Sequence, residues 1–125
     1  MIHLTVDDAL HIARRTLGPD VAVRDVGLIE AAMVRPAASI GGRDAYPTLL
    51  EKAAAVVHST VRNHALVDGN KRLGLMVLVV FLEVNGRGFL ASNDAAYEFI
   101  VAIADGRLDS VPEIAAVLED LVSSS

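Results

Sequence analysis

Cysteine and tryptophan are both missing from this chain of 125 residues, and aromatic residues make up only 4% of it. The lack of cysteine excludes disulfide bonds and thiol chemistry, and it agrees with a reducing cytosol. Because large aromatics are scarce, Leu, Val, Ile and Ala must build the core, which is a composition typical of helical proteins. The length suits one substantial core, so we expect a single domain over residues 1–125.

The chain is also short of basic residues and of long apolar runs. It has 11 Lys and Arg against 16 Asp and Glu, for a formal charge of −5 at pH 7. Since nucleic-acid-binding proteins usually carry a broad basic face, we expect no direct nucleic-acid partner, although a small basic site stays open. The longest apolar run, residues 73–82, is half of the roughly 20 residues that a bilayer span needs, and residues 1–10 do not resemble a signal peptide. We therefore expect a cytoplasmic protein with no membrane segment.

Amphipathic periodicity and helix-boundary residues predict about six helices. They begin at or just after Thr5, Asp25, Thr48, Asp68, Ser92 and Ser110. The helix near Asp68 is apolar nearly all round over residues 75–84 (LMVLVVFLEV), which requires neighbours on every side. We therefore predict an all-α fold, a compact bundle of about six helices around this central buried helix.

Residues 35–47 (RPAASIGGRDAYP) interrupt the helical pattern. They contain two prolines and a Gly-Gly pair and show no helical period. Such a composition is typical of a solvated loop. Gly41-Gly42 between two short segments can also turn a small β-hairpin, so the sequence leaves both structures open.

Charged and polar residues gather in residues 64–72, where the central helix is predicted to begin. The first turn of a helix has N–H groups without partners, and the helix dipole makes it positive, so it binds anions readily. Lys71 and Arg72 oppose that dipole, which is unfavourable unless an anion lies there, and both suit phosphate oxygens. Gly69 would allow a ligand to approach the backbone closely. We expect a phosphate site, although an isolated Lys-Arg pair would more simply be a solvated helix end.

His64, Asp68 and Asn70 each have a structural and a functional interpretation. His64 can be an ordinary structural histidine or a base that takes a proton from a hydroxyl. Asp68 can cap the helix or bind Mg²⁺, and these roles compete for the same lone pairs. Asn70 can contact phosphate, position His64 or remain a surface residue. Their clustering beside two cations favours the functional interpretations. Another histidine, His58, does not have the sequence spacing to any other histidine that a metal site would require.

Residues 64–72, HALVDGNKR, resemble the signature of the Fic/Doc family, HxFx(D/E)GN(G/K)R. The matching positions are His64, Asp68, Gly69, Asn70, Lys71 and Arg72. Tyr46-Pro47 and residues 51–54 (EKAA) also resemble the death-on-curing (Doc) branch, whose members are toxins of type II toxin–antitoxin systems. The resemblance implies the Fic fold, with residues 35–47 as a flap whose exposed edge can pair with an extended segment of a target.

Two positions distinguish the branches of this family. Members that transfer adenylyl groups have Gly where this chain has Lys71, and usually a second arginine where it has Leu75. Both departures are shared with Doc-type toxins, which the resemblance implies are kinases. The implied reaction transfers the γ-phosphate of ATP to a Thr or Ser hydroxyl of a protein. The implied target is a threonine of elongation factor Tu, and the implied outcome is arrested translation.

The resemblance also implies a role for each residue of the motif. His64 would be the general base, Asp68 would bind Mg²⁺, and the phosphates of ATP would lie against Gly69, Asn70, Lys71 and Arg72. The implied partner is an antitoxin whose disordered tail folds as a helix into a groove on the toxin. Leu66 stands where the family has an aromatic residue. Because leucine can fill the same apolar slot, we expect the loop to hold, with the orientation of His64 less firmly fixed.

Two other functions stay open on the sequence. The same motif can transfer AMP, as a nucleotidyltransferase, to a protein hydroxyl. Alternatively, the chain can be a catalytically inactive helical binding module in which the motif survives as a helix start that binds an anion or a partner. ATP labelled at the α- or γ-phosphate separates the two enzymes, and replacing His64 by Ala separates both from the binding module.

Overall fold

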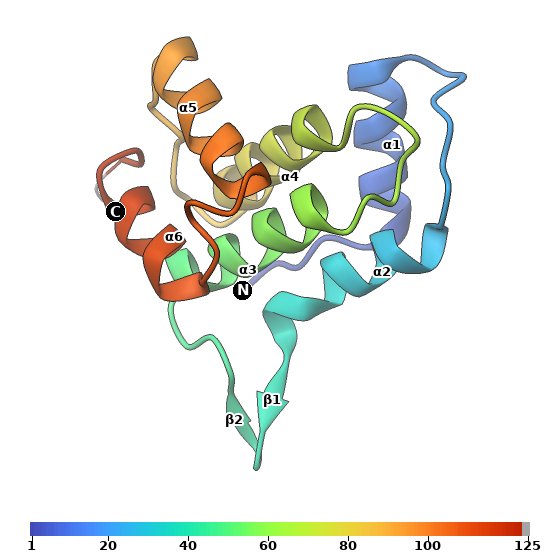
Figure 1. The fold of residues 1–125 in the computed structure, drawn as a ribbon. Helices are drawn as coiled ribbons and strands as arrows, with labels where there is room; N and C mark the ends of the chain where they lie inside the picture. Colours follow the sequence, from blue (N-terminus) through green and yellow to red (C-terminus); the bar gives the residue numbers. More distant parts are fainter. Residues whose placement is uncertain (124–125) are drawn as a thin grey trace.

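Six α-helices and one short hairpin make up most of residues 1–123, the part of the chain that the computed structural model describes (Figure 1). The helices are α1 (Val6–Leu17), α2 (Val26–Val34), α3 (Leu49–Arg62), α4 (Asn70–Val84), α5 (Asn93–Ala104) and α6 (Val111–Glu119). A 3-10 turn, η1 (Arg35–Ala37), follows α2 and leads into the strands β1 (Ser39–Ile40) and β2 (Arg43–Asp44). Within residues 1–123, no helix reaches the length and apolar character needed to cross a bilayer. The predicted all-α bundle of about six helices is confirmed.

Side-chain caps start most of the helices where the sequence predicted them. Thr5 accepts a hydrogen bond from the N–H of Asp8, and the Asp8 carboxylate accepts one from the N–H of Thr5. The residues Asp25, Thr48, Ser92 and Ser110 cap α2, α3, α5 and α6 in the same general way. Each such cap contributes about 1 kcal/mol to stability. The exception is α4, which no side chain caps.

The central buried helix is α3 rather than α4. Ten of the 14 residues of α3 are buried, against six of the 15 residues of α4. Ala53–Ala55 are fully buried, and their small side chains let neighbouring helices approach. The two helices pack tightly at Gly74, where an added Cβ would lie 2.4 Å from the Cγ2 atom of Val61. The bundle therefore has a central helix as predicted, but the segment was wrong. The polar residues of α3 suggested an exposed face, whereas in the structure they are buried and some of them bond to other elements.

The segment between α2 and α3 is a hairpin, so the hairpin interpretation of residues 35–47 is confirmed. Strands β1 and β2 pair antiparallel, with Ser39 opposite Asp44 and Ile40 opposite Arg43. Gly41 and Gly42 both have positive φ, at 59° and 80°, as a two-residue hairpin turn requires. Figure 1 shows the hairpin projecting from the helical body, and all four strand residues are exposed.

Candidate active site

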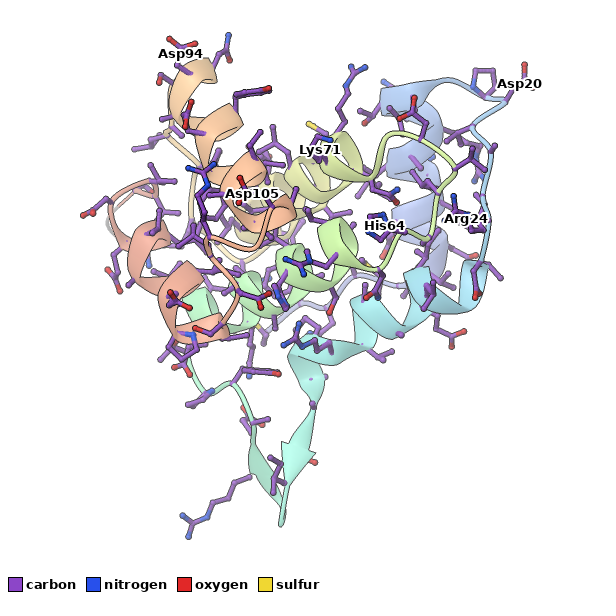
Figure 2. The ribbon with its side chains drawn as sticks, viewed as in Figure 1. Asp20, Arg24, His64, Lys71, Asp94 and Asp105 are labelled. Carbon is purple, nitrogen blue, oxygen red and sulfur yellow. The ribbon has the colours of Figure 1, made fainter. Side chains whose placement is uncertain are left out.

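A pocket of about 440 Å³ lies where the end of α3 and the start of α4 meet the ends of α1 and α5. The six motif residues His64, Asp68, Gly69, Asn70, Lys71 and Arg72 all line this pocket, together with Leu17, Val61, Val67 and Ala104. Figure 2 shows His64 on the loop that follows α3 and Lys71 where that loop enters α4. The structure thus brings together every residue that the sequence singled out.

His64 adopts an unusual backbone conformation. It follows Asn63, the C-cap of α3, and its φ of 54° is the only positive value among the non-glycine residues in residues 1–123. A residue with a Cβ in this left-handed region costs about 1–3 kcal/mol, although histidine tolerates it better than most. The turn leaves the side chain exposed at the edge of the pocket. Strain of this kind persists only when the surrounding structure holds it, and it is typical of functional sites.

The connection between α1 and α2 holds the motif loop from outside. The backbone N–H groups of Arg24 and Asp25 donate to the carbonyl of Ala65 at 2.7 and 3.0 Å, and Val67 N–H donates to the carbonyl of Ala22 at 3.0 Å. Figure 2 shows Arg24 beside the loop that carries His64. We did not predict this support, because nothing in the local sequence pairs these two segments.

Asn70 closes the loop from inside. Its Oδ1 accepts the N–H of Leu66 at 3.0 Å, and its Nδ2 donates to the carbonyl of Leu66 at 3.1 Å. The Leu66 side chain is fully buried, so leucine does fill the apolar slot as expected. Of the roles considered for Asn70, the structure favours the positioning of the loop that begins with His64, since the amide is already engaged there.

Asp68 does not cap α4, so that interpretation was wrong. The N-cap is Gly69, whose φ of 95° turns the chain before the helix begins at Asn70. The Oδ1 atom of Asp68 accepts only the N–H of Gly69, at 2.9 Å, rather than an N–H of the first turn. Its carboxylate is exposed beside the pocket, and no group of three or more His, Asp or Glu residues within residues 1–123 surrounds a possible metal position. One carboxylate completed by phosphate oxygens and water suits Mg²⁺, so the donor set fits this ion.

Gly69 is required for two structural reasons. Its left-handed φ disfavours any residue with a Cβ. A Cβ there would also lie 2.6 Å from the Cδ1 atom of Leu17 at the end of α1. The close approach that the glycine permits is therefore that of Leu17, which sequence analysis did not identify as part of this site.

The start of α4 carries concentrated positive charge. No side chain caps its first turn, so its N–H groups are available to an anion. Lys71 and Arg72 are exposed, and neither forms an ion pair with any residue of the described range 1–123. Two cations and a positive helix end in one place have the charge and the donors that suit a phosphate group.

A second, apolar pocket of about 200 Å³ adjoins the first. Lys71 and Arg72 line both pockets, and the rest of the second lining comes from α4 and α5, including Leu75, Tyr97 and Ile100. Leu75 lies at the position where the adenylyl-transferring members of the family that residues 64–72 resemble usually have a second arginine. The charged pocket at the start of α4 is therefore continuous with an apolar pocket that includes one aromatic side chain.

Comparison with known proteins gives two consistent results. Residues 3–82 match the sequence profile of the Fic/DOC family. The chain is also 43% identical over 113 residues, 87% of each chain, to Toxin Doc from Mycolicibacterium smegmatis. The matched segments include the whole of the motif loop and the start of α4.

Proposed function

Because the chain belongs to the Fic/Doc family, as residues 64–72 predicted, we propose that it is a Doc-type toxin and a protein kinase. The proposed reaction transfers the γ-phosphate of ATP to a Thr or Ser hydroxyl of a protein, with a threonine of elongation factor Tu as the expected target. Phosphorylation of this factor arrests translation.

The observation that carries the proposal is the uncapped, doubly cationic start of α4 beside His64 in one pocket. Phosphoryl transfer needs little covalent chemistry from the protein, but it needs positioned positive charge and an oriented nucleophile. The backbone N–H groups of the first turn, together with Lys71 and Arg72, hold the phosphates and neutralise charge on the leaving group. Mg²⁺, held by Asp68 and phosphate oxygens, would add further neutralisation.

His64 acts as the general base in this proposal. It takes the proton of the target hydroxyl as that oxygen forms a bond to the γ-phosphorus, the bond between the γ-phosphorus and the bridging oxygen breaks, and ADP leaves. The role of Asn70 is to hold the loop so that the imidazole stays at the pocket. The apolar pocket lined by Leu75 and Tyr97 offers a place for the nucleotide base.

The hairpin is the proposed docking site of the protein substrate. Its strand residues are exposed, and an exposed edge can add a strand from an extended segment of the target. The name of the relative, Toxin Doc, supports an antitoxin as a second partner, and we propose that its disordered tail folds as a helix on this chain. ATP and elongation factor Tu are both cytoplasmic, so we propose the same location for this protein.

Labelled ATP tests the proposal directly. With Mg²⁺ and purified elongation factor Tu, label from the γ-phosphate should appear on the factor and label from the α-phosphate should not. Label from the α-phosphate alone would instead identify a nucleotidyltransferase. The variant His64→Ala should fold, bind ATP and lose transfer; if it arrests growth as well as the wild type does, the chain is a binding module and not an enzyme.

A further inference from the structure

A half-buried arginine outside the motif joins the hairpin to the helical body. Arg35, directly after α2, donates from Nε to the hydroxyl of Tyr46 at 3.1 Å. Its Nη1 donates to the Oγ of Ser59 at 2.9 Å and lies 2.9 Å from Nδ1 of His58. Tyr46 belongs to the base of the hairpin, and the other two residues belong to α3. One guanidinium therefore spans the hairpin base and the central helix.

The partners of His58 define the direction of its hydrogen bonds. A guanidinium can only donate, so Nδ1 of His58 accepts from Arg35. The ring hydrogen is then on Nε2, which donates to Oδ1 of Asp109 at 3.2 Å, in the turn before α6. The hydrogen bond from His58, and then the nearby charge of Arg62, lower the pKa of Asp109. Asp109 therefore stays ionised and fixes the imidazole that orients Arg35.

A second cation holds the other side of the hairpin. Lys52 of α3 has a side chain that is only 6% exposed, and its Nζ lies 3.1 Å from Oδ2 of Asp44 in β2. The same ammonium donates to the backbone carbonyl of Tyr46. A buried lysine without such partners would be strongly unfavourable, so this contact is specific.

The hairpin cannot fix its own position. Its strands have two residues each, and an isolated two-stranded ribbon of this size is marginal in water. Its place relative to the rest of the molecule must therefore come from the contacts at its base.

We propose that Arg35 is a positioning residue that sets the hairpin relative to His64. Both Ser59 and His58, which bind its guanidinium, lie near the end of α3, and His64 lies two residues beyond that end, after the C-cap. The last turn of α3 thus connects the residues that hold the hairpin to His64, the proposed general base. The consequence for catalysis rests on the proposed function: Arg35 governs where the target hydroxyl lies, while the ATP seat at the start of α4 does not depend on it.

The test compares Arg35→Lys and Tyr46→Phe with Arg15→Lys, a matched change at an exposed arginine of α1. Lysine keeps the charge of Arg35 but cannot reach three partners in one plane, and phenylalanine removes only the hydroxyl acceptor. For each purified protein we would measure amide hydrogen exchange of residues 39–44, the KM for elongation factor Tu, and the Kd for ATP with Mg²⁺.

Arg35→Lys should speed exchange in residues 39–44 and raise the KM for elongation factor Tu by about tenfold or more, since small misplacements of a substrate are costly. Tyr46→Phe should move both quantities in the same direction by less. The Kd for ATP should stay within about twofold of that of Arg15→Lys, because the first turn of α4 is untouched.

Three results would overturn the inference. One is hairpin exchange in Arg35→Lys and Tyr46→Phe that matches the control. Another is faster exchange with an unchanged KM. The third is a loss of ATP affinity in proportion to the change in KM, which would indicate general damage. A wild-type protein that neither binds ATP nor transfers phosphate would refute the proposed function instead, and the exchange data would still decide whether Arg35 holds the hairpin.

Discussion

Replacing Asn70 by Ala removes the two hydrogen bonds that close the loop from His64 to α4. The bonds join its amide to the N–H and the carbonyl of Leu66, at 3.0 and 3.1 Å. A typical intramolecular hydrogen bond contributes about 0.5–1.5 kcal/mol, so the loop loses about 2 kcal/mol. The left-handed conformation of His64 costs a similar amount, about 1–3 kcal/mol. The substitution therefore removes about as much free energy as the left-handed conformation of His64 costs, so that conformation is no longer strongly favoured.

A loss of about 2 kcal/mol corresponds to a change of about 30-fold in an equilibrium constant. If the loop relaxes whenever His64 leaves its conformation, kcat/KM for transfer of the γ-phosphate to elongation factor Tu should fall by about 10- to 30-fold. Amide exchange at residues 65–67 should increase in parallel.

Asn85→Ala is the matched control for this experiment. Asn85, the C-cap of α4, makes the same kind of paired bonds to the backbone of Ile2, at 2.7 and 2.8 Å. It should cost at least as much stability in urea unfolding, because the Asn85 Nδ2 also donates to the carbonyl of Phe81 at 2.9 Å, and it should leave kcat/KM nearly unchanged. The reasoning is refuted if Asn70→Ala keeps kcat/KM within about twofold of the wild type, or if Asn85→Ala loses as much activity.

Three further changes have defined outcomes. Gly69→Ala should destabilise the protein by about 2 kcal/mol or more in urea unfolding, and by less in a Leu17→Ala background, because the Cβ clash with Leu17 is then relieved. Lys71→Met should weaken ATP binding by about tenfold or more in calorimetry, since it removes one charged hydrogen-bond donor, and should stabilise the ATP-free protein by about 0.3–1 kcal/mol in urea unfolding, because the ammonium opposes the helix dipole. The hydrogen bond from His58 lowers the pKa of Asp109. The ionised carboxylate therefore stabilises the folded protein fully above its usual pKa of 3.8, and this stabilisation is lost as the pH falls through the pKa of Asp109 in the folded protein. The stability difference between the wild type and Asp109→Asn should accordingly shrink toward zero in unfolding curves taken at decreasing pH below 3.8.

Local signals in the sequence predicted most of the fold. Capping residues such as Thr5 and Ser110 bond within three residues of themselves, so their role can be read from the sequence alone. The choice of central helix could not, because Lys52 and Ser59 make α3 look half-solvated although partners from the hairpin and from η1 bury them. The segment 35–47 stayed ambiguous for the same reason, since contacts to α3 decide how it is held.

The candidate site divides in a similar way. Its six motif residues lie within nine positions, so a loop between two helices brings them together wherever the helices lie. The supports of that loop come from far along the chain. Ala22 and Arg24 bond to it through backbone atoms, which any residue type provides, and Leu17 packs on Gly69. Side-chain patterns in a sequence do not predict contacts between backbone atoms, so the supports of the motif loop could be found only in the structure.

The motif loop and the start of α4 together carry three features that each reduce stability. An uncapped first turn costs about 1 kcal/mol, two cations near a positive helix end cost about 0.3–1 kcal/mol each, and a left-handed His64 costs about 1–3 kcal/mol. A bound phosphate relieves the first two, because it accepts from the free N–H groups and neutralises Lys71 and Arg72. It does nothing for His64. The strain of His64 therefore needs another explanation. In the proposed reaction, it holds the imidazole beside the phosphates of ATP, whereas a simple anion-binding module would have no need of a strained histidine.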